Sequence, residues 1–159
     1  MDIKSRNSYP AGTLSNFAPH RFVVDGIECA SMEGFLQSLK FSSPEMQVEV
    51  CKLVGKAAKA KGASKNWRQT QTLYWKGKAY KRDSEEYQKL LDKAYNQLAK
   101  NEGFKKALLA TGDATITHSK GKKKMSETVL TTKEFTSRLT KIRERLKEEK
   151  KHDLGTDLL

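Results

Sequence analysis

The chain has 159 residues, of which 31% are charged and 36% apolar, and its formal net charge is +12. This length fits one domain, and the leucines and aromatic residues spread along it indicate a folded rather than a disordered protein. Such a basic protein is often a partner of nucleic acid or nucleotides, although many small basic domains bind neither. With no run of 18 apolar residues and no signal-peptide pattern, we expect a cytoplasmic protein without a membrane span.

The first predicted element is a β-hairpin over residues 20–30, HRFVVDGIECA. Asp25 and Gly26 lie between apolar flanks, and glycine tolerates the positive φ that a type I′ turn requires. Ser31 is then the expected N-cap of a helix that continues to Phe41.

The next segment, PEMQVEVCKLVGKAAKAKG, is predicted to form one continuous helix. Ser43 is its expected N-cap, Pro44 occupies the first helical position, and Gly62 is expected to end the helix in a left-handed conformation. Its apolar stripe comprises Met46, Val50, Leu53, Val54 and Ala57. A segment with few helical signals follows and contains Trp67.

The second half of the chain begins with two capped helices. Ser84 is the expected cap of a helix whose inward-facing residues are Tyr87, Leu90, Leu91, Ala94, Tyr95 and Leu98. Asn101 precedes a short helix that Gly112 is expected to close. Residues 114–117, ATIT, resemble a short strand, and a loop with dense positive charge follows.

A last helix begins at a capping box formed by Thr131 and Glu134. Its predicted inner face comprises Phe135, Leu139, Ile142 and Leu146. Together these elements predict an α+β fold that is mostly helical and has a small β-hairpin. We expect one domain over residues 1–147 and a polar C-terminal tail over residues 148–159.

Motifs for the common metal and cofactor chemistries are absent from the sequence. Cys29 and Cys51 have no CxxC spacing and are expected as reduced, buried thiols. The three histidines lie far apart, and the chain contains no Walker loop, GxGxxG or GxSxG motif. We therefore expect neither a metal ion nor a cofactor.

Glu33, Gln37 and Lys40 fall at i, i+4 and i+7 and share one face of the helix predicted over residues 31–41. They span about 10 Å of helix axis, so their side chains can converge on a group the size of a sugar ring. A glutamate there can act as a general acid or base, and a lysine can bind phosphate or, with a lowered pKa, attack a sugar C1. Polar residues at this spacing usually form a solvated face, but the rest of the circumference is apolar and favours burial.

Other candidate residues each have two interpretations. Asn16 is either a turn residue or a ligand contact, and Phe17 either fills the core or stacks on a base. Trp67 is a core anchor or a stacking platform. The loop THSKGKKKMSET is a solvated charge run or a phosphate site, and its candidate residues are His118, Ser119, Lys120, Gly121 and Glu127.

Three blocks of the sequence, taken in order, resemble the NADAR family. The first contains Ser15-Asn16-Phe17, the hairpin, and the helix with Glu33, Gln37 and Lys40-Phe41; the second is GKAAKAKG with Trp67-Arg68; the third covers residues 104–143. The resemblance extends from about residue 9 to residue 146. The HSKG and ETVL segments differ from the Asp and Trp-Gly ending of riboflavin-pathway members, and resemble a branch associated with viruses and mobile elements.

The resemblance implies a mostly helical α+β fold and cleavage of a ribose C1–N bond beside a phosphate. Activities known in the family include hydrolysis of phosphoribosylamino-pyrimidine intermediates and removal of ADP-ribose from guanine bases of nucleic acid. Glu33 would be the general acid or base and Lys40 the catalytic amine. The expected ribose contacts are Asn16, Gln37 and Glu127, the expected base-stacking residues are Phe17 or Trp67, and the expected phosphate contacts are His118, Ser119, Lys120 and Gly121.

The expected function is therefore an ADP-ribosyl N-glycosidase acting on ADP-ribosylated guanine, in DNA or in nucleotides. Its basic surface is expected to contact nucleic acid, and no membrane partner is expected. Two alternatives stay open: an N-glycosidase of riboflavin-pathway intermediates, and a non-catalytic binder of NAD-derived nucleotides.

Overall fold

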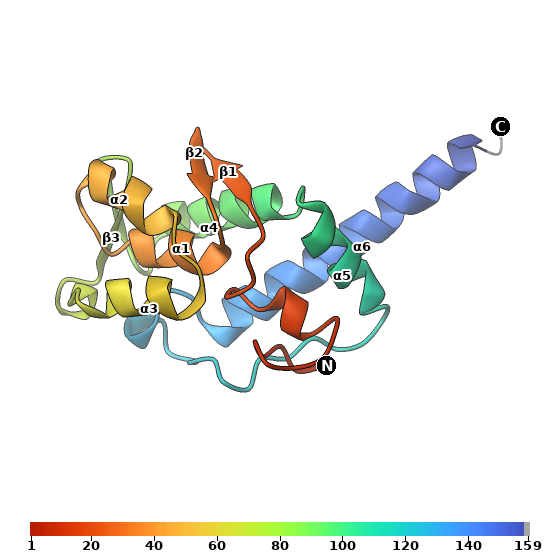
Figure 1. Cartoon of the computed structure of the whole chain (residues 1–159), viewed down its shortest axis with the longest axis horizontal. Helices are drawn as coiled ribbons and strands as arrows, with labels where there is room; N and C mark the ends of the chain where they lie inside the picture. Colours follow the sequence, from red (N-terminus) through yellow and green to blue (C-terminus); the bar gives the residue numbers. More distant parts are fainter. Residues whose placement is uncertain (158–159) are drawn as a thin grey trace.

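The described chain forms six α-helices and two separate β-hairpins (Figure 1). The structure is a computed structural model that describes the backbone of residues 1–157 and the side chains of residues 1–153. The α-helices are α1 (Met32–Ser38), α2 (Pro44–Cys51), α3 (Gly55–Ala63), α4 (Glu85–Leu98), α5 (Glu102–Ala110) and α6 (Thr132–Asp157). The strands are β1 (Phe22–Val24), β2 (Ile27–Cys29), β3 (Thr72–Trp75) and β4 (Lys78–Lys81), and the short 3-10 helices are η1 (Gly12–Leu14), η2 (Trp67–Gln69) and η3 (Met125–Glu127). The predicted α+β class is confirmed.

The two hairpins share one kind of turn. Strands β1 and β2 pair antiparallel around Asp25 and Gly26, whose φ angles of 48° and 82° are those of the predicted type I′ turn. The second hairpin, β3–β4, lies in the segment for which no strand was predicted. Its turn residues, Lys76 and Gly77, have φ angles of 50° and 84°, so a lysine occupies a left-handed position that usually favours asparagine, aspartate or glycine.

Helix α1 begins at its predicted cap but is shorter than predicted. The Ser31 hydroxyl accepts a hydrogen bond from the backbone N–H of Gly34 at 3.1 Å. The helix ends at Ser38 rather than at Phe41. The backbone N–H of Lys40 still donates to the carbonyl of Gln37 at 3.2 Å, so the helical curvature continues past the last α-helical residue.

The continuous helix predicted after Pro44 is wrong, because the chain forms α2 and α3 with a break between them. Val54 is extended and Gly55 has a φ of 52°, a left-handed conformation that interrupts the helix. Gly62 does not end α3 but lies inside it and is buried. Because of this break, the residues of the predicted apolar stripe do not share one buried face: Val50 is buried, whereas Val54 is 39% exposed.

Helices α4, α5 and α6 supply much of the core. All six residues predicted to face inward from α4 are buried, as are the four predicted for α6. The capping box of α6 is confirmed in both directions: Glu134 N–H donates to Thr131 Oγ1 at 3.1 Å, and Thr131 N–H donates to Glu134 Oε1 at 2.7 Å. Gly112 follows α5 with a φ of 59°, as predicted. Cys29 and Cys51 are buried and free, as predicted.

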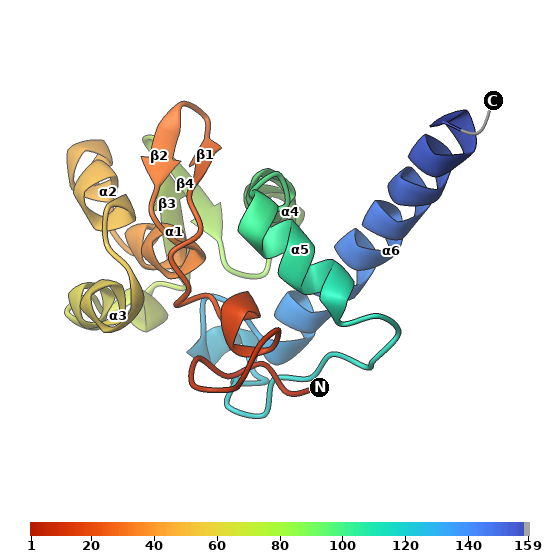
Figure 2. The ribbon, with the colours of Figure 1, turned by 45° about the vertical axis from the view of Figure 1, so that its right-hand side comes forward.

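The strand predicted over residues 114–117 is reduced to a single bridge. Thr117 pairs with Asp2 in a parallel bridge, and Ile3 N–H donates to the carbonyl of Thr117 at 2.8 Å. This short contact is too small to form a strand, but it ties the N-terminal segment to the loop between α5 and α6. Both run along the same side of the molecule in Figures 1 and 2.

Helix α6 crosses the body and continues beyond it (Figure 2). The boundary predicted between residues 147 and 148 falls inside this helix. Among the described residues, no helix has the length and apolar character that crossing a membrane requires.

Candidate functional site

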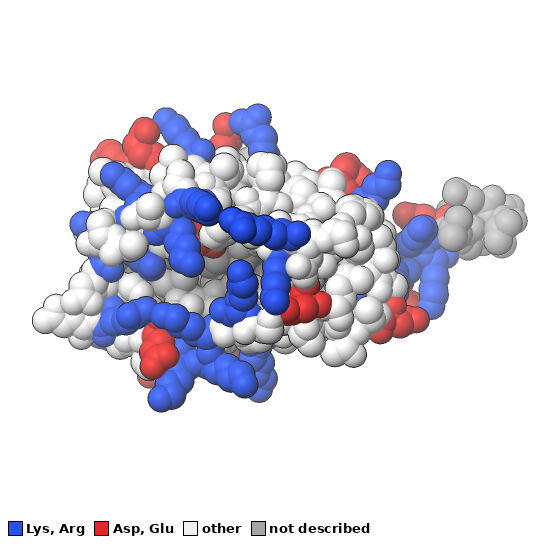
Figure 3. Space-filling model, turned by 60° about the horizontal axis from the view of Figure 1, so that its bottom comes forward, with Lys and Arg blue, Asp and Glu red and all other residues white. Residues whose placement is uncertain are grey.

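A cavity of about 750 Å³ opens between α1, α3 and the loop that precedes α6. Its walls come from four separate parts of the chain: residues 4–17, 33–40, 59–68 and 118–135. In Figure 3, Lys and Arg side chains gather around a hollow on the face formed by these segments. The cavity is large enough for a dinucleotide-sized ligand.

Ten of the eleven predicted site residues line this one cavity: Asn16, Phe17, Glu33, Gln37, Lys40, Trp67, His118, Lys120, Gly121 and Glu127. Ser119, the eleventh, does not line the cavity. Both its backbone N–H and its hydroxyl donate to the carboxylate of Asp2, at 2.8 and 2.6 Å. These bonds lower the pKa of Asp2 to about 2, and they commit the donors of Ser119 to holding the N-terminal segment.

Glu33 and Gln37 form the inner polar pair of the cavity. The side-chain amide of Gln37 donates to Glu33 Oε1 at 2.9 Å. Burial raises the pKa of Glu33, while the Gln37 bond and the charges of Lys59 and Lys40 oppose that rise. Burial prevails, so the carboxyl is biased toward its protonated form and can serve as a proton donor.

Gln37 is held in place from the opposite side by α3. Its Oε1 is buried and has no hydrogen-bond partner among the described residues. This oxygen lies directly against Gly62, where an added Cβ would lie 2.6 Å from the side-chain Cδ of Gln37. A glycine is therefore required at position 62 for the amide to reach Glu33.

The pKa of Lys40 is shifted in the opposite direction from that of Glu33. Burial lowers the pKa of Lys40, and the charges of Arg68, Lys122 and Lys59 lower it further, although Glu33 opposes the shift. The amine is thereby biased toward its neutral, nucleophilic form. The two groups thus share a cavity in which each is pushed toward the uncharged state.

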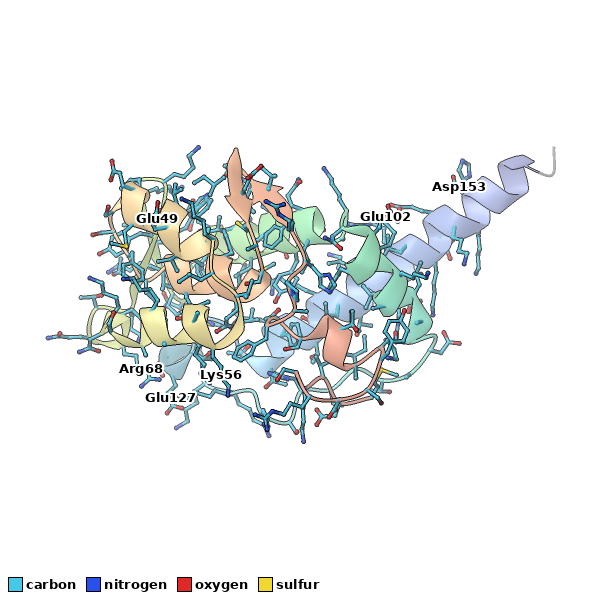
Figure 4. All side chains as sticks on the ribbon, viewed as in Figure 1. Glu49, Lys56, Arg68, Glu102, Glu127 and Asp153 are labelled. Carbon is cyan, nitrogen blue, oxygen red and sulfur yellow. The ribbon has the colours of Figure 1, made fainter. Side chains whose placement is uncertain are left out.

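Positive charge surrounds this pair. The cavity is lined by two carboxylates, Glu33 and Glu127, and by the cationic residues Lys4, Lys40, Lys59, Lys65, Arg68, Lys120 and Lys122. Five of these cations, Lys4, Lys59, Lys65, Arg68 and Lys122, were not among the predicted site residues. No local motif marks the first four, whereas Lys122 belongs to the basic loop singled out in the sequence. Figure 4 shows Arg68 and Glu127 close together below α3, and Arg68 Nε donates to the backbone carbonyl of Glu127 at 3.2 Å.

The loop before α6 is anchored by buried groups behind it. Arg82 Nε donates to the carbonyl of Thr128 at 2.8 Å, and the Tyr87 hydroxyl donates to the carbonyl of Val129 at 2.6 Å. The Arg82 guanidinium also makes a bidentate pair with Glu134, at 2.6 and 3.1 Å. This buried network fixes the wall of the cavity opposite α3.

His118 and Gly121 shape the end of the same loop. His118 Nδ1 lies 2.7 Å from the carbonyl of Ile3, which identifies Nδ1 as the protonated ring nitrogen, and the ring meets Phe135 edge-on at 5.1 Å. A Cβ on Gly121 would collide with Thr132 Oγ1 and lie 2.6 Å from His118 Cδ2. A side chain at position 121 would therefore displace Thr132 or the His118 ring.

The two aromatic candidates differ in how much surface they offer. Trp67 lines the cavity but is 6% exposed and belongs to the hydrophobic core, so it offers little surface for stacking. Phe17 is half-buried and lines the cavity. Among the described residues, no group of three His, Cys, Asp or Glu side chains is arranged to hold a metal ion.

Comparisons with known proteins place the chain in a family of phage proteins. It is 37% identical over 150 residues, 92% of this chain and 98% of the relative, to a protein of Enterobacteria phage T4 described as "Uncharacterized 17.1 kDa protein in Gp30-rIII intergenic region". Its fold is similar to that of the E. coli protein YbiA, solved by NMR, with a TM-score of 0.58 and 20% identity over 93% of this chain and 84% of YbiA. YbiA is a NADAR family member, so the fold is NADAR-like. Residues 8–144 match the Bacteriophage protein GP30.3 family, and the chain belongs to that family.

Proposed function

We propose that this protein is an N-glycosidase that cleaves a ribose C1–N bond and removes ADP-ribose from guanine, in DNA or in nucleotides. The observation that carries the proposal is the pair formed by Glu33 and Lys40, which line one cavity and are both biased toward the neutral state. The NADAR-like fold supports the class of reaction by analogy.

The chemistry assigns one step to each group. The neutral amine of Lys40 attacks C1 of the ribose, and the electron pair of the C1–N bond moves to the leaving nitrogen of the base. The protonated carboxyl of Glu33 gives its proton to that nitrogen. Loss of a proton and opening of the ribose ring convert the lysine adduct into a Schiff base, which water hydrolyses to free sugar and amine.

The surrounding cations favour a diphosphate over a monophosphate ligand. Seven cationic side chains line the cavity, and Lys59, Lys65 and Arg68 lie on the α3 side, whereas Lys120 and Lys122 come from the facing loop. Two walls of positive charge fit the pyrophosphate of ADP-ribose, which lies between a ribose and an adenosine. A riboflavin-pathway intermediate carries one phosphate and would leave much of this charge uncompensated.

Two substrates and two variants test the proposal. We expect the protein to release ADP-ribose from ADP-ribosylated guanosine or an ADP-ribosylated oligonucleotide, and not to hydrolyse a phosphoribosylamino-pyrimidine. Glu33→Gln and Lys40→Ala should remain folded and lose turnover. Lys61→Ala is the matched control, because Lys61 is an exposed lysine of α3 that does not line the cavity.

Borohydride trapping during turnover examines the covalent step. Reduction of the Schiff base should attach the sugar to Lys40 and should label neither the Lys40→Ala variant nor another lysine. Full turnover by both active-site variants would refute the assignment. Saturable binding of ADP-ribose without any turnover of the wild-type protein would instead support the non-catalytic binder.

A further inference from the structure

Tyr95 lies behind the cavity, on α4, and is completely buried. Its hydroxyl donates to Oδ1 of Asn16 at 2.8 Å, and its ring packs against Phe135 with 6.2 Å between the ring centroids. Burial raises the pKa of Tyr95 well above its ordinary value, so the phenol keeps its proton. A buried hydroxyl needs an acceptor for that proton, and Asn16 supplies it.

Asn16 is fixed at two points. Its side-chain oxygen accepts from Tyr95, and its backbone carbonyl accepts from the N–H of Glu33 at 3.0 Å. Asn16 lines the cavity, and the hydrogen bonds that it makes to other described residues use its Oδ1 and its backbone carbonyl and leave Nδ2 available. A flipped amide would turn Nδ2 toward Tyr95 and leave the phenol proton without an acceptor, so the hydrogen bond determines which end of the amide faces the cavity.

We propose that Tyr95 is a positioning residue that holds the NH₂ group of Asn16 toward the cavity, where it donates to an oxygen of the bound sugar beside Glu33. A fixed N–H donor selects a ligand that offers a lone pair at this point, such as a ribose oxygen, and discriminates against one that offers an N–H. The sugar as ligand rests on the proposed function. The orientation of the amide does not, because it follows from the Tyr95 bond alone.

The test removes only the phenol oxygen. Tyr95→Phe keeps the ring in the core, and we expect ADP-ribose to bind about 3- to 10-fold more weakly, the usual effect of one lost hydrogen bond. In nuclear magnetic resonance spectra, the side-chain amide of Asn16 should lose its single ordered signal pair in this variant. Tyr87→Phe is the control, because it removes another buried hydroxyl of α4, one that bonds Val129 and not Asn16. It should leave the Asn16 amide signals unchanged.

A second variant separates positioning from folding. Asn16→Asp keeps an oxygen for Tyr95 but presents an oxygen to the cavity in place of NH₂. It should bind ADP-ribose more weakly, and adding Tyr95→Phe to it should cause no further loss. A folded Tyr95→Phe protein with unchanged ADP-ribose affinity and unchanged Asn16 signals would overturn the inference. If the wild type binds no ADP-ribose, the proposed function fails, and the Asn16 amide signals alone still support or overturn the role of Tyr95.

Discussion

Replacement of Gly62 by alanine tests whether the contact between α3 and Gln37 controls the acidity of Glu33. The new Cβ would collide with Oε1 of Gln37 and lie 2.6 Å from its Cδ and 3.0 Å from its Cβ. Since the whole end of the side chain is involved and Gln37 is only 7% exposed, a small rotation does not relieve the overlap. We expect the Gln37 amide to move away from Glu33.

Two effects follow, and their sizes differ. Loss of a hydrogen bond to a carboxylate costs about 1.5–3 kcal/mol, which corresponds to an approximately 10- to 150-fold lower kcat if Glu33 depends on that bond in the transition state. Overpacking costs about 1–3 kcal/mol of stability, and alanine in place of glycine inside a helix returns about 0.5–1 kcal/mol. The net loss, about 0–2.5 kcal/mol, lowers Tm by at most about 10 °C in a domain of this size. Activity should therefore fall much more than stability.

The assay compares ADP-ribose release and thermal unfolding in the wild type and four variants. Gly103→Ala is the control for the glycine-to-alanine change in a helix, because a Cβ there meets no atom closer than 3.4 Å. Gln37→Ala should reproduce the loss of kcat, and Gln37→Ala combined with Gly62→Ala should be no worse than Gln37→Ala alone. Additive losses in the double variant, or a Gly62→Ala protein with wild-type kcat, would refute the proposed contact.

Three further variants probe the charged groups. Glu134→Ala leaves the guanidinium of Arg82 buried without its carboxylate partner. Chemical denaturation should therefore show that the free energy of unfolding falls by about 3–5 kcal/mol. Burial alone would raise the pKa of Glu134, but hydrogen bonds, first among them that from Arg82, hold this pKa below its usual value. The wild type should therefore lose stability as the pH falls through that lowered pKa. The Glu134→Ala variant should lack this part of the acid sensitivity. Arg68→Ala removes a cation that lowers the pKa of Lys40, so the pH–rate limb that reports a neutral Lys40 should move to higher pH. Glu33→Gln should raise Tm at pH 7, because a carboxyl whose folded pKa is raised loses stabilisation as pH rises through that value, and the gain should shrink in acid.

Local signals in the sequence predict those parts of the fold that depend on neighbouring residues. Ser31, the Asp25-Gly26 turn and the Thr131–Glu134 capping box each act within a few residues, and each is present as predicted. The second hairpin was not predicted because its turn places Lys76 in a left-handed conformation that lysine rarely adopts. Tertiary contacts support this turn: Gln47 Oε1 accepts from the backbone N–H of Lys76 at 3.0 Å.

The break between α2 and α3 was likewise not predicted because it depends on tertiary contacts. Composition favours one helix, but the carbonyls of Val50, Cys51 and Leu53 approach Gly34 so closely that an added Cβ there would lie 2.6 Å from the nearest, that of Leu53. The Ser31 hydroxyl donates to the carbonyl of Leu53 at 2.9 Å. These contacts between α1 and the chain after α2 exist only in the folded protein, so no periodicity in the sequence reports them.

The residues of the candidate site also fall into two groups, those predicted from local spacing and those that only tertiary packing brings to the cavity. Glu33, Gln37 and Lys40 were predicted because their spacing is local, and the structure brings them to one cavity. Lys59 and Arg68 reach that cavity from α3 and the segment after it, and only the packing of α3 on α1 identifies them as part of it. Single lysines in a chain of this charge carry no positional signal of their own.

The cations that we propose bind phosphate also lower the pKa of both central groups, Glu33 and Lys40. Lys59 lowers the pKa of Glu33 and so opposes its protonation, while Arg68, Lys122 and Lys59 lower the pKa of Lys40. A bound pyrophosphate neutralises those cations, so both pKa values should rise, and the complex should hold more protons than the free protein. Calorimetric titration with ADP-ribose in buffers of different ionisation enthalpy should therefore show net proton uptake, reduced in Glu33→Gln. Proton release on binding would contradict this coupling. The proton that Glu33 gives to the leaving base would then be drawn into the site by the substrate's own phosphates.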